Sequence, residues 1–109
     1  MKWKVITLNK EVDNELEMLD VTFQAKFLHI AEMLENFGPE NVKEPYCKAL
    51  GNKLWEIRMK GRPGIARAIY VTIKNKKIVI LHAFVKKTQQ TPKKAINIAL
   101  NRLKEVICL

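Results

Sequence analysis

The chain has 109 residues, of which 48% are hydrophobic and 28% are charged, and its net charge is +9. This length suits one domain with one hydrophobic core, which we expect to span residues 1–109. No apolar run approaches the roughly 18 residues that cross a bilayer, and the N-terminal segment lacks the long apolar core of a signal peptide, so we expect a cytoplasmic protein without a membrane partner. Cys47 and Cys108 stand far apart without metal-ligand spacing, which indicates buried or functionally indifferent thiols and not a disulfide or a zinc site.

The first 40 residues predict a strand followed by a helical hairpin. Residues 2–8 are rich in Val, Ile and Thr, as is typical of a strand. Asn9 and Asp20 are good N-cap residues, and apolar residues recur after each at three- and four-residue spacing, which predicts two amphipathic helices. Gly38 and Pro39 end the second helix. We interpret the acidic residues of the hairpin as a solvated surface: Glu11, Asp13, Glu15, Glu17, Glu32 and Glu35.

The remaining residues predict a basic sheet and a closing helix. Residues 41–53 contain a proline and a glycine and are expected to form a loop. Three strand-like runs follow within residues 54–86, and the short turns between them predict an antiparallel meander. Thr91 then caps, and Pro92 begins, a last amphipathic helix. We therefore expect an α+β fold of order β-α-α-β-β-β-α, in which the helical hairpin and the C-terminal helix pack on a mainly antiparallel, twisted sheet.

Positive charge is concentrated in the second half of the chain. Residues 1–44 hold five basic and nine acidic side chains, a net charge of −4, whereas residues 45–109 hold fifteen basic and two acidic ones, a net charge of +13. Several cations lie inside the predicted strands, which indicates a cationic groove on the sheet that binds a polyanion. Lys93 and Lys94 fall in the first turn of the last helix, where the helix dipole disfavours cations, and this indicates a corner that meets phosphate.

The residue types in this region suit RNA cleavage without a metal ion. The sequence lacks a glycine-rich phosphate loop, an HExxH motif and a nucleophile elbow, and its grouped acids are too few for a catalytic divalent metal, so we expect no metal and no cofactor. In metal-free cleavage one group takes the proton of the ribose 2′-OH, cations stabilise charge on the phosphate oxygens, and another group protonates the leaving 5′-oxygen. The candidate catalytic residues are Glu56, Arg58, Arg67, His82 and Lys86, and the candidate RNA-binding residues are Lys60, Lys87, Lys93 and Lys94.

The strings LWEIRMKGRPGIARAIY and KNKKIVILHAFVKKTQQTPKK, with the closing helix, resemble the HigB branch of the RelE toxin superfamily, whose members are phage- or plasmid-associated toxins of type II toxin–antitoxin pairs. The resemblance covers nearly the whole chain. It implies a RelE-like fold and a ribosome-dependent endoribonuclease, or mRNA interferase, that cuts mRNA in the decoding site of the ribosome. It also implies a cognate helix-turn-helix antitoxin that holds the toxin inactive.

The resemblance assigns roles to individual positions. Glu56 and Arg58 fall where RelE proper has two lysines, and Arg67 falls on the arginine that binds the scissile phosphate. Either Lys86 or Lys87 lies near the arginine that ends the third meander strand. RelE proper then has a tyrosine, and here the chain reads Thr88, Gln89 and Gln90, so the proton-transfer scheme of RelE cannot be copied. Glu56 and His82 are the candidates for that role.

Other interpretations of these residues remain open. Glu56 and Arg58 share a strand face and can simply pair with each other. Arg67 alternates with apolar residues, so it is either a structural residue or part of the groove floor. His82, in an apolar strand, fits a core histidine as well as a catalytic one. The alternative functions are a ParE-like toxin that inhibits DNA gyrase and a noncatalytic RNA- or ribosome-binding module.

Overall fold

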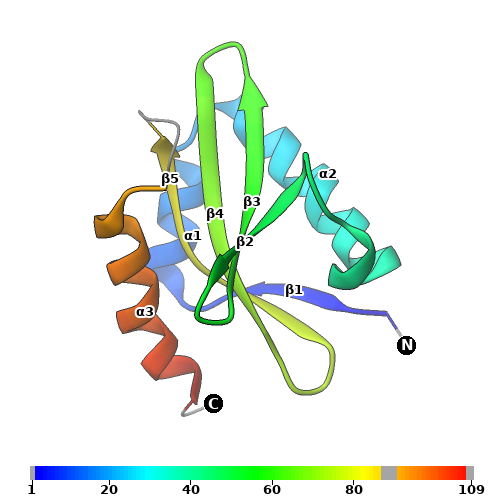
Figure 1. Ribbon diagram of the computed structural model, residues 1–109. Coiled ribbons are helices and arrows are strands. Elements are labelled where there is room, and N and C mark those ends of the chain that lie inside the picture. Colours follow the sequence, from blue (N-terminus) through cyan, green and yellow to red (C-terminus); the bar gives the residue numbers. More distant parts are fainter. Residues whose placement is uncertain (1, 87–90, 108–109) are drawn as a thin grey trace.

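The computed structural model describes residues 2–86 and 91–107. Its elements are β1 (Lys4–Thr7), α1 (Lys10–Glu17), α2 (Val21–Phe37), a 3₁₀ turn η1 (Pro39–Asn41), β2 (Cys47–Gly51), β3 (Leu54–Gly61), β4 (Gly64–Ile73), β5 (Lys77–Lys86) and α3 (Lys93–Ile107) (Figure 1). The strands form one sheet of order β1-β5-β4-β3-β2, in which β1 is parallel to β5 and the other neighbours are antiparallel. The α+β fold and the antiparallel meander are thus confirmed.

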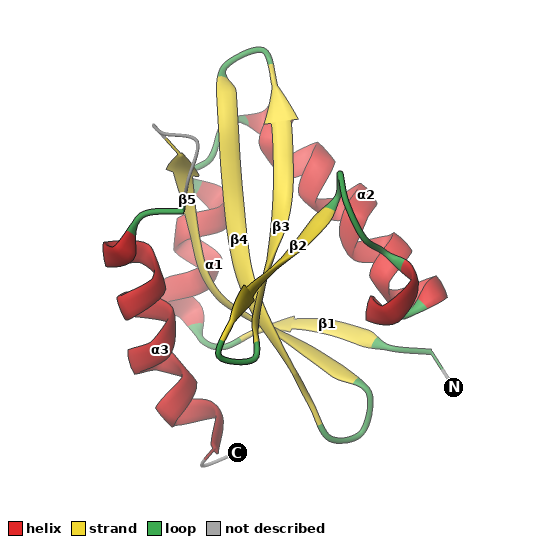
Figure 2. Ribbon diagram, viewed as in Figure 1, coloured by secondary structure: helices red, strands yellow, loops and turns green. Residues whose placement is uncertain are grey.

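Helices cover both faces of the sheet, with α1 and α2 on one face and α3 on the other (Figure 2). The apolar residues of β4 alternate between the two sides: Ala68 and Tyr70 join the cluster under α1 and α2, whereas Ile69 and Val71 join the cluster under α3. This alternation follows from the two-residue period of a strand. A central strand such as β4 is therefore apolar on both faces, and a charged residue within it is an exception. Within the described residues, no helix combines the length and the apolar composition that crossing a bilayer requires.

The helical hairpin begins and ends at the predicted residues. The Asn9 side chain accepts a hydrogen bond from the Val12 N–H at 3.1 Å, and Asp20 accepts one from the Thr22 N–H at 2.9 Å. Each cap satisfies a backbone donor that the first helical turn leaves unpaired. At the end of α2, Gly38 has a φ of 84° and its N–H donates to the Leu34 carbonyl at 2.9 Å. A residue with a Cβ would be strained in this left-handed conformation.

The prediction of a loop over residues 41–53 is wrong in part, because β2 lies within it. This edge strand pairs antiparallel with β3 through a turn in which Asn52 and Lys53 have positive φ. In β2 only the first residue, Cys47, is buried, so the strand lacks the alternation of buried and exposed residues that would reveal it. The register places Lys48 opposite Glu56 and so adds a cation to the basic sheet.

The cysteine prediction is tested at one of its two positions. Cys47 is a free, buried thiol, and its burial raises the pKa of the thiol to about 11. A thiol with so high a pKa is mostly protonated, and therefore unreactive, at neutral pH. Cys108 lies outside the described residues.

The interpretation of the hairpin acids as a solvated surface is wrong for three of them. Asp13 accepts a hydrogen bond from the Thr7 hydroxyl at 2.5 Å, and Glu35 accepts one from the Val5 N–H at 2.8 Å. Glu15 accepts one from the Ala83 N–H in β5 at 3.1 Å. These carboxylates bind the helical hairpin to β1 and β5 through hydrogen bonds. Helical periodicity alone does not predict such contacts.

Candidate active site

The strands β3, β4 and β5 extend past α3 (Figure 1), and their register places several cations on one face of the sheet there. Arg58 of β3 is paired with Arg67 of β4, which is paired in turn with Phe84 of β5. Directly paired residues project from the same face, so the register brings side chains from neighbouring strands together. By this register the surface consists of Lys48, Glu56, Arg58, Lys60, Arg67 and Lys86, which we call the basic face.

Arg67 and Glu56 form the floor of the basic face. Both are 2% exposed, and Arg67 Nε lies 3.1 Å from Glu56 Oε1. The other carboxylate oxygen of Glu56 accepts a hydrogen bond from the Thr91 hydroxyl at 2.6 Å, so the residue expected to cap α3 also holds the carboxylate. Burial lowers the pKa of Arg67, Glu56 acts in the opposite direction, and Arg58 adds to the lowering. The guanidinium keeps its charge at neutral pH because its ordinary pKa is so high.

Lys86, at the end of β5, is the residue that this strand contributes to the basic face. Its side chain is 8% exposed. Burial lowers the pKa of Lys86, and the positive charges of Arg67 and Arg58 lower it further against the opposing effect of Glu56. A lysine with a lowered pKa gives up its proton more readily than an exposed one. The basic face therefore combines the fixed charge of Arg58 and Arg67 with a lysine, Lys86, whose pKa is lowered.

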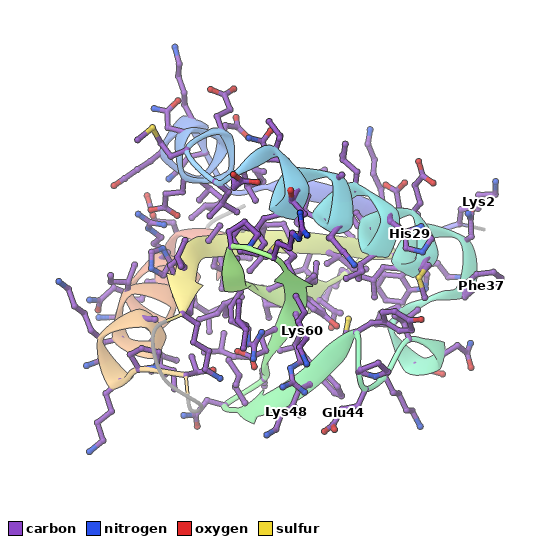
Figure 3. All side chains as sticks on the ribbon, turned by 90° about the horizontal axis from the view of Figure 1, so that it is seen from above. Lys2, His29, Phe37, Glu44, Lys48 and Lys60 are labelled. Carbon is purple, nitrogen blue, oxygen red and sulfur yellow. The ribbon has the colours of Figure 1, made fainter. Side chains whose placement is uncertain are left out.

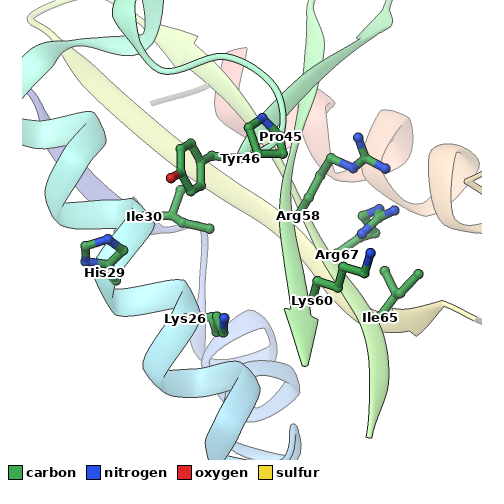
Figure 4. A pocket seen from close by; sticks show the side chains of 9 residues that line it. All are labelled: Lys26, His29, Ile30, Pro45, Tyr46, Arg58, Lys60, Ile65 and Arg67. Atoms are coloured by element: carbon green, nitrogen blue, oxygen red, sulfur yellow. The ribbon is translucent and has the colours of Figure 1, made fainter. Parts of the chain in front are cut away.

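A cavity of about 550 Å³ opens beside this surface, at the edge of β3 (Figure 4). One wall is formed by the side chains of Arg58, Lys60 and Arg67, and the other by α2 and the segment before β2. Figure 3, seen from above, shows His29 on α2 and Lys48 and Lys60 on the strands. The volume is within the range of roughly 300–1,000 Å³ that small-molecule sites occupy.

The structure places His82 in a different cluster from the other catalytic candidates. His82 Nδ1 lies 2.9 Å from Glu15 Oε1, and the imidazole stacks on Phe84 with ring centroids 5.0 Å apart. In the sheet His82 is paired with Ile69, which in turn is paired with Glu56, so a whole strand separates His82 from Glu56. Of the two residues that the sequence left as alternatives for proton transfer, only Glu56 contacts a cation of the basic face, Arg67, whereas His82 contacts Glu15.

The candidate RNA-binding residues divide into three groups. Lys60 is exposed at the end of β3 and lines the cavity. Lys93 and Lys94 are exposed in the first turn of α3. Lys87 lies outside the described residues, as do Thr88, Gln89 and Gln90, which replace the tyrosine of RelE proper.

Three polar contributors to this region were missed by sequence reasoning. Lys48 was hidden because β2 was assigned to a loop. Thr91 was interpreted as a helix cap, although its hydroxyl donates to Glu56. Lys26 lies on the exposed surface of α2, where one more lysine carries no signal, and it reaches the cavity only because α2 packs beside the edge of β3. All three depend on contacts between segments distant in sequence.

Comparison with known proteins defines the class of this fold. The chain is similar to a chain in the crystal structure of the archaeal RelE–RelB complex from Pyrococcus horikoshii OT3, with 27% sequence identity, a TM-score of 0.57, and coverage of 80% of this chain and 98% of the other. The protein therefore has the RelE-like toxin fold. Residues 14–104 match the family described as phage derived protein Gp49-like (DUF891), and the chain belongs to that family. No curated protein sequence matches the chain significantly.

Proposed function

We propose that the protein is the toxin of a type II toxin–antitoxin pair and a ribosome-dependent endoribonuclease of the HigB type. The likeness to the RelE–RelB structure and the Gp49-like family supports the toxin role. The observation that carries the enzymatic part is the convergence of Arg58, Arg67 and Lys86 around the carboxylate of Glu56. This set contains both the fixed positive charge and the proton-transfer groups that metal-free RNA cleavage needs.

The first step assigned to this site is phosphate binding. The scissile phosphate binds Arg58 and Arg67 and competes with Glu56 for the Arg67 guanidinium, which now lies 3.1 Å from Glu56 Oε1. Displacing Glu56 from the guanidinium frees a carboxylate oxygen in a site from which water is largely excluded. Binding of the substrate thereby makes Glu56 available as a base, which explains how a carboxylate that is 2% exposed in the free protein can take part.

Bond cleavage then follows in one displacement. Glu56 takes the proton of the ribose 2′-OH, the 2′-oxygen attacks phosphorus, and the bond from phosphorus to the 5′-oxygen breaks. Arg58 and Arg67 stabilise the charge that develops on the phosphate oxygens. Lys86 donates a proton to the departing 5′-oxygen, a role for which its lowered pKa suits it. The products are a 2′,3′-cyclic phosphate and a 5′-hydroxyl, and the side chains supply the charge that a metal ion would otherwise supply.

Two partners belong to this proposal. The substrate is mRNA held in the decoding site of the ribosome, and the regulator is a cognate antitoxin of the helix-turn-helix class. The RelE–RelB likeness supports the antitoxin partner. Met18, Val21 and Leu28 are 86%, 75% and 61% exposed on the helical hairpin, and these apolar side chains offer the antitoxin a surface away from the basic face.

The decisive experiment measures mRNA cleavage on translating ribosomes and identifies the new RNA ends. The wild-type protein should produce a 5′-hydroxyl, and Arg67→Ala should lower kcat by roughly 10² to 10³, as for loss of one positioned oxyanion donor. Glu56→Gln keeps the shape of the side chain and should lower kcat by roughly 10² to 10⁴ through loss of the base. Arg62→Ala, which removes an exposed arginine from the β3–β4 turn, is the matched control and should change little.

Three outcomes would count against the proposal. A 5′-phosphate product would exclude attack by the 2′-OH. A folded, fully active Arg67→Ala variant would make Arg67 purely structural. Tight binding to ribosomes without any cleavage would favour the noncatalytic ribosome-binding module, and growth arrest through DNA gyrase with intact mRNA would favour the ParE-like alternative.

A further inference from the structure

The second wall of the cavity beside β3 is not used by the cleavage steps described above. It consists of Lys26, His29 and Ile30 from α2 together with Pro45 and Tyr46 from the segment before β2. Figure 4 shows these side chains across the edge of β3 from Arg58, Lys60 and Arg67. The cavity thus continues around the strand edge from the basic face toward α2.

The chemistry of this wall differs from that of the basic face. The described residues that line the cavity include four cations and no carboxylate, so the cavity favours an anion throughout. The second wall adds the exposed aromatic ring of Tyr46 and the adjacent aliphatic side chain of Ile30. An aromatic surface beside cations is the combination that binds the base and the phosphate of single-stranded nucleic acid.

The backbone holds Tyr46 beside the proposed cleavage site. The Tyr46 N–H donates to the Lys43 carbonyl at 2.9 Å, and the Tyr46 carbonyl accepts a hydrogen bond from the Arg58 N–H at 2.8 Å. The second bond also shows that the backbone groups of Arg58 point away from β4. In an antiparallel pair this direction repeats at every second residue, so the N–H and carbonyl of Lys60, a residue that lines the cavity, also point away from β4. A donor and an acceptor at a strand edge are suited to the hydrogen-bonding edge of a base.

We propose that this wall is a subsite for the nucleotide adjacent to the scissile phosphate, an inference that rests on the proposed function. The base stacks on the Tyr46 ring and meets the backbone groups of Lys60, and its flanking phosphate binds Lys26. The RNA strand therefore bends around the edge of β3, with the scissile phosphate on the basic face and its neighbour on the α2 side. The subsite positions RNA and takes no part in proton transfer.

Titration of the ¹⁵N-labelled protein with 5′-AMP, followed by amide NMR shifts, tests the subsite without ribosomes. The amides of Tyr46, Lys60 and His29 should shift with 5′-AMP, whereas inorganic phosphate should shift mainly those of Arg58 and Arg67. Tyr46→Ala should weaken 5′-AMP binding about tenfold, as expected for loss of one base–aromatic stack, and leave phosphate binding unchanged. Tyr46→Phe keeps the ring and should bind 5′-AMP as the wild type does. Lys74→Ala, in the exposed β4–β5 turn, is the control for loss of one positive charge.

The outcomes separate this inference from the proposed function. Shifts with 5′-AMP confined to Arg58 and Arg67, or 5′-AMP binding by Tyr46→Ala as tight as by the wild type, would overturn the subsite and leave the cleavage mechanism standing. Absence of any shift at Tyr46 and Lys60 at millimolar 5′-AMP would overturn it as well. Nucleotide binding at Tyr46 by a protein that cuts no mRNA on ribosomes would instead support the subsite and refute the endoribonuclease.

Discussion

The guanidinium of Arg102 in α3 binds both carboxylate oxygens of Glu15 in α1, with distances of 3.0 Å from Nη1 to Oε1 and 2.8 Å from Nη2 to Oε2. The two residues lie 87 positions apart and come from helices on opposite faces of the sheet. They meet at the edge of β5 beyond Ile80, where β1 has ended. There Glu15 accepts the Ala83 N–H, and Arg102 donates to the Leu81 carbonyl at 2.8 Å. The pair thus satisfies an exposed strand edge and joins both helical layers.

Glu15→Gln should lower the free energy of unfolding by about 2 kcal/mol, the order of a hydrogen bond to a charged group. The substitution removes the charge that offsets Arg102, which is 13% exposed, while Glu11 remains 3.1 Å from the guanidinium. Denaturant unfolding measures the change. Glu17→Gln, at an exposed acid of the same helix, is the matched control and should stay within about 0.5 kcal/mol of the wild type. Equal effects of the two substitutions would show that the ion pair adds nothing.

The same pair predicts a dependence of stability on pH. Burial opposes ionisation of Glu15, but hydrogen bonds from Arg102 and the Ala83 N–H outweigh it, so the pKa of Glu15 lies below its ordinary value. Such a carboxylate contributes stability above its unfolded pKa and loses the contribution as pH falls through the folded pKa. The stability gap between wild type and Glu15→Gln should therefore be widest above pH 4.5 and narrow below it. A gap that grows on acidification would contradict the assignment.

His82 should behave as a positioning residue for Glu15 and not as an acid or base. In His82→Asn the amide nitrogen can replace Nδ1 and donate to Glu15, so both cleavage and stability should stay close to the wild-type values. His82→Leu breaks the 2.9 Å contact and should cost about 1 kcal/mol of stability with little change in kcat. If His82 were a general acid or base, kcat should instead fall by roughly 10² to 10⁴ in both variants. Paired unfolding and cleavage measurements therefore distinguish the two roles.

Lys86 should determine how the cleavage rate falls at alkaline pH, the alkaline limb of the pH–rate profile. A general acid must be protonated, so the rate should fall as pH rises through the folded pKa of Lys86, which burial and the nearby arginines hold below the ordinary value of 10.5. Lys86→Arg should remove this fall, because a guanidinium stays protonated across the range. Lys60→Met, which alters an exposed lysine of the same face, should raise KM and keep the alkaline limb. An unchanged limb in Lys86→Arg would exclude Lys86 as the acid.

Most helices and strands could be predicted from the sequence because capping residues and apolar periodicity mark them within a few residues. Asn9, Asp20 and Gly38 act through neighbouring backbone groups, so their roles can be read from a few residues. β2 carries no such signal, since a mostly exposed edge strand shows neither alternation nor an apolar run. The order of the meander, by contrast, followed from turns short enough to leave one topology.

From the sequence, neighbouring side chains in the candidate site can be predicted only where short turns constrain the register of the strands. Arg58 and Arg67 meet because adjacent antiparallel strands with a short turn have few possible registers. His82 could not be placed in this way, because the register shifts at Tyr70 and leaves Leu81 as an extra residue of β5. A strict two-residue period would put His82 on the side of Ile80, under α1 and α2. One inserted residue changes the neighbours of every side chain beyond it.

Lys93 and Lys94 should contribute to ribosome binding through charge alone. Replacing both with alanine should flatten the dependence of log affinity on log salt by about 0.7 for each phosphate of single-stranded RNA that the variant no longer binds. Lys74→Ala with Lys77→Ala removes the same charge at exposed positions near the β4–β5 turn and should leave the slope unchanged. Relief of two cations from the first turn of α3 should also raise stability by a few tenths of a kcal/mol each, because the helix dipole disfavours them there. If stability rises but the salt slope is unchanged, these lysines touch no phosphate. If the slope becomes flatter while kcat is unchanged, the two lysines contribute to binding, and the chemistry is left to Arg58, Arg67 and Lys86.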